Sequence, residues 1–136
     1  MTEFTTTTEV PWKDQITNIT TVEIQTTMNV GSNAFNGASA LTTVTLHDSM
    51  TSIGDSSFNG CSSLSTITLP EMLTTIESNS FTSTKLSQLI IYDKVTTIKS
   101  SAFNTNTITT VEFKGTTGPT CDSTVLQHQL QKLKYQ

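Results

Sequence analysis

The sequence predicts a mostly-β solenoid of stacked repeats with a period of 22–23 residues. Apolar residues recur at the same spacing in three consecutive segments, 41–63, 64–85 and 86–107. In each segment they first alternate with polar residues, which is the period of a β-strand with one buried face. A turn rich in small polar residues and carrying a single Phe follows. Because one such unit cannot bury its apolar face alone, neighbouring repeats are expected to stack.

The repeat pattern divides the chain into a cap, an array and a diverged end. Residues 1–18 are the predicted N-terminal cap segment, in which Pro11 opens a helical turn and Trp12 covers the apolar end of the stack. The first repeat of the array is one residue short between Met28 and Val30. The array is predicted at 19–115, with repeats at 19–40, 41–63, 64–85 and 86–107 and the start of a fifth at 108–115.

Residues 116–136 are a diverged repeat that allows two interpretations. In one, Asp122 caps an amphipathic helix. In the other, the register continues, so that Cys121 takes an Ile position and a partial sixth strand begins at Leu130 and acts as the C-terminal cap. Leu130 follows Ile108 by 22 residues, which is the repeat step and favours the sixth strand.

One Phe in each repeat is expected to form a column through the interior of the stack. A small residue precedes each Phe and leaves room for the ring of the neighbouring repeat. This predicted Phe column consists of Phe35, Phe58, Phe81 and Phe103, preceded by Ala34, Ser57, Ser80 and Ala102. Cys61 and Cys121 are predicted to be small buried residues, because more than two repeats separate them and a disulfide cannot span that distance.

The pattern LxxVxLPxxLxxIxxxxFxxCxx resembles the BspA-like, Treponema-type class of leucine-rich repeats. In the second repeat the matching positions are Leu41, Val44, Leu46, Ile53, Gly54, Phe58 and Cys61. The resemblance implies a right-handed leucine-rich-repeat solenoid with a parallel β-sheet on its concave side, and it implies no enzyme activity. Many members of this class are surface or secreted proteins of mucosal bacteria and protists, linked to adhesion and to host-protein binding.

The resemblance therefore implies a protein partner, extracellular or of a host, and an extracellular or cell-surface location. The sequence itself adds no support for secretion. Residues 1–12 have neither the basic region nor the apolar region of a secretory signal peptide.

The outward-facing residues of the predicted concave strands are the candidate partner-binding surface. Most are threonine, which is common on solvated strand faces. Ile90 and Tyr92 stand out as apolar residues where the pattern expects polar ones, and Tyr is a frequent interface anchor. The candidate contact residues are Tyr92, Ile90, Pro70, His47 and Lys114. The alternative interpretation is that these are scattered exposed apolar side chains without a role in binding.

Composition and charge argue against several other classes of function. A net charge of −4 gives no electrostatic attraction to nucleic acid or to an anionic membrane. No apolar run approaches the length that spans a bilayer, so no membrane insertion is expected. His47 and His128 lie several repeats apart, so the sequence predicts no zinc site, no His-based catalytic group and no cofactor.

Self-assembly is the alternative function. Residues 1–68 carry six acids and one lysine, whereas residues 69–136 carry five acids and six lysines. Open strand edges at two ends of different charge favour homotypic end-to-end stacking, and heterologous contacts of that kind give filaments. The chain is then a structural protein that forms head-to-tail solenoid filaments. An ice-binding Thr surface is disfavoured, because only two predicted strands carry Thr-x-Thr and the array is expected to curve.

Overall fold

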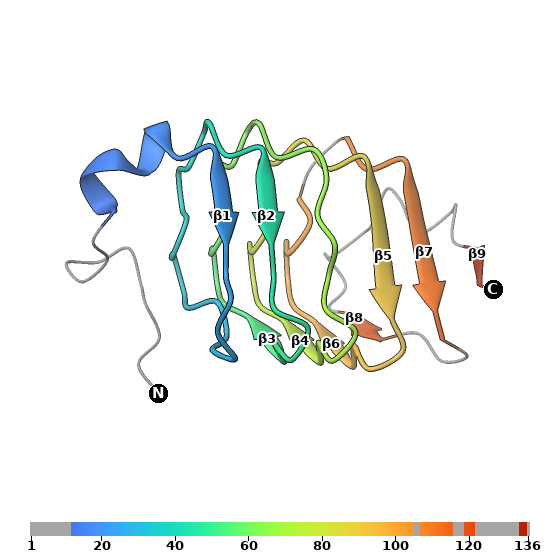
Figure 1. The fold of residues 1–136 in the computed structure, drawn as a ribbon. Helices are drawn as coiled ribbons and strands as arrows, with labels where there is room; N and C mark the ends of the chain where they lie inside the picture. Colours follow the sequence, from blue (N-terminus) through green and yellow to red (C-terminus); the bar gives the residue numbers. More distant parts are fainter. Residues whose placement is uncertain (1–11, 105–106, 116–118, 122–133, 136) are drawn as a thin grey trace.

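The computed structural model describes residues 12–104, 107–115, 119–121 and 134–135, which form a solenoid with parallel strands on two faces (Figure 1). The short 3₁₀-helix η1 (Lys13–Asn18) lies at one end and strand β9 (Lys134–Tyr135) at the other. Each turn of the solenoid, here called a rung, runs along one face, turns, and returns along the other. The predicted mostly-β repeat solenoid is confirmed.

The concave face carries the longer strands. It is formed by β1 (Thr21–Glu23), β2 (Thr43–Thr45), β5 (Gln88–Tyr92), β7 (Thr110–Lys114) and β9. Each neighbouring pair is parallel and follows the repeat register, with Val22 opposite Val44 and Leu89 opposite Val111. The opposite face is one four-stranded parallel sheet of β3 (Ser52–Ile53), β4 (Thr75–Ile76), β6 (Thr97–Ile98) and β8 (Thr120–Cys121).

The concave sheet is interrupted in the third rung. The sequence predicts a strand there, but residues 64–70 form none, so this face consists of two sheets, β1-β2 and β5-β7-β9. The chain still passes between β2 and β5 (Figure 1). A 3.4 Å hydrogen bond from the Ser87 N–H to the Ser65 carbonyl keeps the third and fourth rungs in register. Pro70 ends the stretch and has no N–H to donate to a neighbouring strand.

A stack of aromatic rings runs through the interior and confirms the Phe column. The ring centroids lie 5.5, 5.4 and 5.2 Å apart, in order, along Phe35, Phe58, Phe81 and Phe103. Trp12 adds a further ring at the N-terminal end, because its indole stacks on Phe35 at 5.5 Å. The Trp12 indole N–H also donates to the Ala34 carbonyl at 3.1 Å. The small residues that precede each Phe are buried, as predicted.

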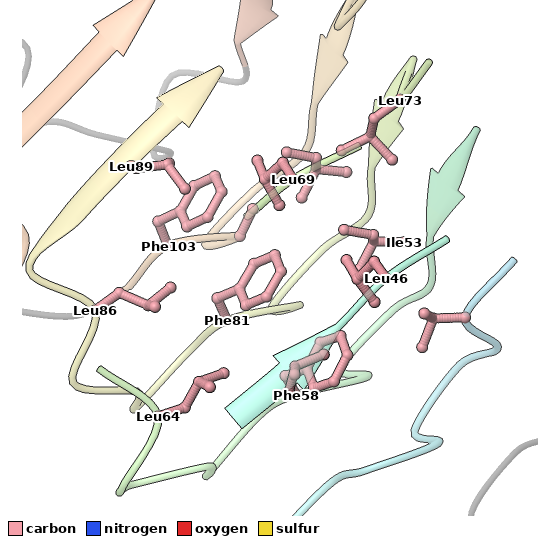
Figure 2. Packing of buried hydrophobic residues seen from close by; sticks show 14 of the residues in the cluster. Leu46, Ile53, Phe58, Leu64, Leu69, Leu73, Phe81, Leu86, Leu89 and Phe103 are labelled. Carbon is pink, nitrogen blue, oxygen red and sulfur yellow. The ribbon is translucent and has the colours of Figure 1, made fainter. Parts of the chain in front are cut away.

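Aliphatic side chains from both faces pack around the Phe column (Figure 2). In the third rung, Leu64, Leu69, Leu73 and Ile76 are at most 2% exposed. Ile67, which the alternating pattern predicts to be buried, is only partly buried. It lies in the rung in which the concave sheet is interrupted, so the weaker pairing of the backbone and the weaker burial of the side chain coincide.

Hydrogen bonds between rungs hold the Phe-containing turns together. The amides of Phe35, Phe58 and Phe81 each donate to the carbonyl of the small residue before the next Phe, at 2.8 Å to Ser57, 2.9 Å to Ser80 and 2.7 Å to Ala102. A buried amide without such a partner would cost free energy comparable to a lost hydrogen bond. The turns are therefore stabilised by the adjacent rung as well as by their own local contacts.

Part of the threonine content of the chain has a structural role. Several threonine hydroxyls donate to a backbone carbonyl of the preceding rung. Among the donors are Thr42, Thr74, Thr96 and Thr109, with distances of 3.0, 2.9, 3.3 and 3.1 Å. These side chains bridge successive rungs at the surface, so an abundance of threonine on this fold does not by itself indicate a ligand site.

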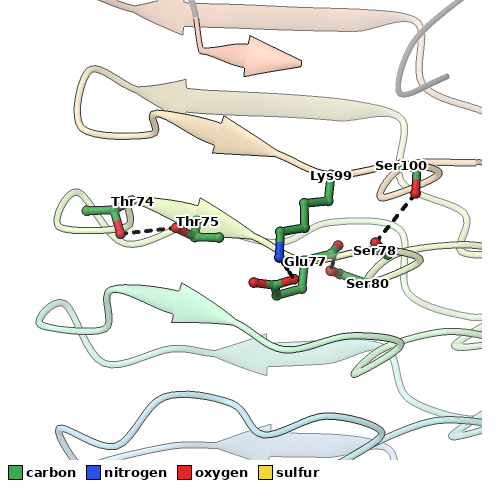
Figure 3. A network of polar contacts seen from close by, with 7 residues as sticks. All are labelled: Thr74, Thr75, Glu77, Ser78, Ser80, Lys99 and Ser100. Carbon is green, nitrogen blue, oxygen red and sulfur yellow. Dashed lines mark hydrogen bonds and ion pairs between the residues drawn. The ribbon is translucent and has the colours of Figure 1, made fainter. Parts of the chain in front are cut away.

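Polar contacts also join the rungs along the four-stranded face (Figure 3). The Lys99 ammonium lies 2.6 Å from the Glu77 carboxylate, and the hydroxyls of Ser78 and Ser100 are 3.5 Å apart. Exposed ion pairs of this kind add little to stability. They do show that polar groups on this face are paired with each other across rungs.

The first rung replaces a missing backbone carbonyl with a side chain. In the third rung, the amides of Thr74 and Thr75 both donate to the Thr51 carbonyl, at 2.8 and 3.2 Å. The first rung is one residue short at the corresponding point. There the Asn29 side-chain oxygen accepts the bonds instead, from the amides of Thr51 and Ser52 at 2.9 and 3.0 Å.

Gly54, one of the positions that match the repeat pattern, lies against the backbone of the first rung. A Cβ atom at Gly54 would lie 2.6 Å from both the Gly31 carbonyl carbon and the Ser32 nitrogen. Non-bonded heavy atoms do not approach so closely without displacing the chain. The corresponding positions of the later rungs carry Glu77 and Lys99, so the need for glycine is specific to this contact.

The C-terminal part of the described chain continues the repeat register. Cys121 of β8 pairs with Ile98 of β6. Strand β9 pairs with β7, so that Lys134 is opposite Glu112. This is the register of the interpretation with a sixth strand. The helical alternative falls largely on residues 122–133, which lie outside the described residues, as does most of the predicted cap segment.

Truncating a central ring of the Phe column is expected to destabilise the solenoid strongly. Phe58 is fully buried and stacks on a ring in each neighbouring rung. Phe58→Ala is expected to lower the free energy of unfolding by about 3–5 kcal/mol, measured by urea denaturation. Met72→Ala is the control, since Met72 is 43% exposed, and should change it by less than about 0.5 kcal/mol. Equal unfolding midpoints for Phe58→Ala and wild type would contradict the Phe column.

The Asn29 side chain is expected to matter through its acceptor oxygen. Asn29→Ala removes the acceptor of two backbone amides of the second rung, one exposed and one part-buried, so the free energy of unfolding should fall by about 1 kcal/mol. Asn29→Asp is the matched control, because it keeps an acceptor at the same place and should lose much less. Thermal and urea denaturation of the three proteins measure the difference. Equal losses in the two variants would show that the acceptor oxygen is not what matters.

Candidate functional site

Ile90 and Tyr92 lie on the outward side of β5. The strand alternates as predicted, with Leu89 and Ile91 buried, Ile90 39% exposed and Tyr92 half-buried. The two outward side chains form a short apolar ridge. By contrast, the outward residues of β2 are exposed threonines.

Strand β7 places two charges beside this ridge. Its parallel pairing with β5 brings Glu112 opposite Ile90 and Lys114 opposite Tyr92. The Lys114 ammonium and the Glu112 carboxylate form an ion pair with each other. We call these four residues, Ile90, Tyr92, Glu112 and Lys114, the β5–β7 patch. It combines exposed apolar area with a charged border on one side.

The structure brings together only three of the five residues predicted to form the contact. Pro70 is buried, so the expectation that it presents a surface to a partner is corrected. His47 is half-buried and follows β2, two rungs before β5, where its Nδ1 accepts a hydrogen bond from the Ser49 N–H at 3.2 Å. Two rungs correspond to about 10 Å at ordinary strand spacing, which separates His47 from Tyr92.

Met72 is an exposed apolar residue that the alternating pattern does not identify. It is 43% exposed and lies in the turn after Pro70. The Lys94 ammonium, two residues beyond Tyr92, lies 2.8 Å from the Met72 sulfur. A comparison of the turns of successive repeats identifies Met72 as unusual, because the equivalent positions carry the polar residues Ser49 and Lys94. The turn of the third rung thus adds an apolar group near the same edge of the concave face.

The described residues contain no cluster suited to a metal ion, and the thiol of Cys61 is buried. Within residues 12–104, 107–115, 119–121 and 134–135, no three His, Cys, Asp or Glu side chains gather so that they could hold a metal ion. The Cys61 thiol is fully buried and donates to the Phe35 carbonyl at 3.3 Å. Burial raises the pKa of this thiol to about 12, so it stays protonated and weakly nucleophilic at neutral pH. No helix in the described part of the chain is long and apolar enough to cross a bilayer.

A comparison with models of protein families shows which family the chain belongs to. The model of the BspA type leucine rich repeat region matches residues 13–127 in six copies. The chain belongs to the BspA-type leucine-rich repeat family. The match begins in η1 and extends past β8, so the family pattern takes in both the cap helix and the diverged C-terminal repeat.

Solved structures with the same fold include two bacterial proteins. A leucine-rich repeat protein from Bacteroides ovatus is 31% identical, with a TM-score of 0.67 over 70% of this BspA-type chain and 25% of its own. A leucine rich cell surface protein from Faecalibacterium prausnitzii is 24% identical, with a TM-score of 0.54 over 74% of this chain and 40% of its own. The chain thus spans less than half the length of each. No curated protein matches it.

Proposed function

We propose that this chain is a non-enzymatic protein-binding or adhesion module that contacts its partner through the β5–β7 patch. The observation that carries the proposal is Ile90, which is 39% exposed on a strand whose register directs it outward. In this position the side chain contributes little to the core of its own chain. In an interface it supplies apolar area, and Tyr92 beside it supplies a large ring with a polar end.

The scaffold beneath the patch supports a binding role. β5 and β7 are the five-residue strands of the concave face, and they pair along their full length. Backbone positions fixed in this way lose little conformational freedom on binding, which lowers the entropic cost of association. Glu112 and Lys114 provide charged groups at the border of the patch, as in the polar rim of many protein interfaces.

A cell-surface location, with an extracellular or host protein as the partner, is part of the proposal. The Faecalibacterium protein of the same fold is described as a cell surface protein. Adhesion would take place in that setting, and a binding surface made of backbone-anchored strand residues suits a protein partner better than a small molecule.

The proposal predicts that Ile90 and Tyr92 dominate the affinity for a partner. Purified extracellular-matrix and host-surface proteins are screened for binding to the chain by biolayer interferometry, and the Kd of each hit is measured for wild type and for Ile90→Ser/Tyr92→Ser. Loss of a central anchor costs about 2 kcal/mol or more, so the Kd should rise at least about 30-fold.

Thr43→Ser/Thr45→Ser is the matched control, because it alters outward residues of β2 on the same face. Its Kd is expected to stay close to that of wild type. An unchanged affinity in Ile90→Ser/Tyr92→Ser would contradict the patch. So would an equal loss of affinity in the β2 control.

A further inference from the structure

The N-terminal end of the solenoid contains an open apolar hollow with a volume of about 570 Å³. The side chains of the first rung contribute most of its apolar lining, including Val22, Ile24 and Met28. The equivalent residues of the second rung, Val44 and Leu46, are buried because a rung lies on each side of them. Val22 and Ile24 are only half-buried. The first rung thus exposes part of the interior of the solenoid.

Trp12 covers a different part of this end. Its ring lies on Phe35 and so extends the Phe column, and Ile16 of η1 packs against the core beside it. Trp12 and Phe35 line one side of the hollow, which extends from them along β1. Among the described residues, the cap therefore covers the end of the Phe column and leaves the strand side of the first rung accessible.

Strand β1 also presents backbone hydrogen-bonding groups at this end. The Ile24 N–H points toward β2, because it donates to the Thr45 carbonyl at 2.9 Å. Successive residues in a paired strand direct their backbone groups to opposite sides. Thr21 and Glu23 therefore direct theirs to the outer edge, where no described strand pairs with β1. Such an edge is a template for a further parallel strand.

We propose that this end binds the C-terminal strand β9 of a second copy of the chain, so that copies stack head to tail. The two ends belong to one parallel stack, so β9 of one copy has the direction and spacing of a rung placed before β1 of the next. The proposed junction adjoins the β5–β7 patch, because β9 pairs with β7, but it does not depend on the proposed binding of a partner by that patch. Because the contact is heterologous, it generates open filaments rather than closed oligomers.

The strand register pairs opposite charges across the proposed junction. In β1 and β2, Glu23 is opposite Thr45. The repeat spacing continues this column from Thr45 through Thr68 to Ile90. In the later rungs Ile90 is opposite Glu112, and Glu112 is opposite Lys134. Glu23 and Lys134 therefore occupy the same column in the first and the last described strands of the concave face. When the column continues from one copy to the next, Lys134 comes opposite Glu23, and cross-strand pairs of opposite charge are stabilising.

Charge also favours a junction between an N-terminal and a C-terminal end over a junction between two N-terminal ends. Joining two N-terminal ends would bring Glu23 near a second Glu23, and like charges opposite each other on neighbouring strands are destabilising. The net charges of the two halves of the chain also favour joining unlike ends. Six acids against one lysine give residues 1–68 a charge of −5, whereas six lysines against five acids give residues 69–136 a charge of +1.

A charge swap tests the junction in the full chain, with assembly followed by sedimentation velocity over a series of concentrations. Wild type is expected to associate more at higher concentration and less at high salt. Glu23→Lys and Lys134→Glu should each weaken association about tenfold, because a favourable pair becomes a repulsive one. Lys134→Glu also faces Glu112 of its own chain, so the rescue is judged against that single variant: Glu23→Lys/Lys134→Glu has the same contact within the chain and should associate more strongly than Lys134→Glu alone. Thr45→Lys, in the same column but inside the stack, is the matched control and should associate like wild type.

Two results would overturn the proposal outright. One is a monomer at every concentration, and the other is association that neither charge reversal changes. A third result overturns it by naming another occupant. If only a variant lacking residues 1–11 associates, the chain's own N-terminal segment fills the hollow in the full chain. Circular dichroism checks that every variant is folded, and Ile90→Ser/Tyr92→Ser should associate like wild type because it alters a different surface.

Discussion

Contact between successive rungs is the interaction on which the rest of this structure depends. A single rung has no core of its own. Its ring in the Phe column lies between rings of its neighbours, and the amide of that Phe donates to a carbonyl one rung further on. Threonine hydroxyls repeat the connection at the surface. Stability in such an array is approximately a sum of rung and nearest-neighbour terms.

The same dependence makes the ends of the solenoid different from its middle. Val44 and Leu46 are covered from both sides and buried, whereas Val22 and Ile24 are covered from one side only among the described residues. Stacking therefore produces a continuous interior and, necessarily, an end at which that interior is accessible. Any partner that supplies another parallel strand can continue the array there.

The outward positions of the concave face accept a wider range of residue types than the buried positions do, because outward side chains take no part in the core. That freedom allows Ile90 to occupy the position that Thr45 has in the second rung, and Tyr92 the position of His47. The backbone beneath them remains fixed by pairing with β7. A rigid array with a variable outer surface is the arrangement that repeat proteins use for recognition.

The sequence was sufficient for the features that depend on residue type and period alone. The Phe column, the alternating burial in β5 and the position of Cys121 beside Ile98 all follow from spacing. The features that it did not predict depend on contacts between particular atoms of neighbouring rungs. A shortened rung is visible in the sequence, but the replacement of its carbonyl by the Asn29 side chain is not.

The candidate site shows the same limit. The strand pattern predicts that Pro70 faces outward, but residues 64–70 form no strand on the concave face and Pro70 is buried.

Hydrogen exchange of the native protein, followed by NMR, tests the central role of rung-to-rung contact most directly. The amides of Phe58 and Phe81 donate to the next rung and should exchange only on global unfolding, while the outward amides of Thr21 and Glu23 exchange rapidly in dilute solution. Exchange of Phe58 and Phe81 as fast as that of the β1 edge would contradict this account of the fold.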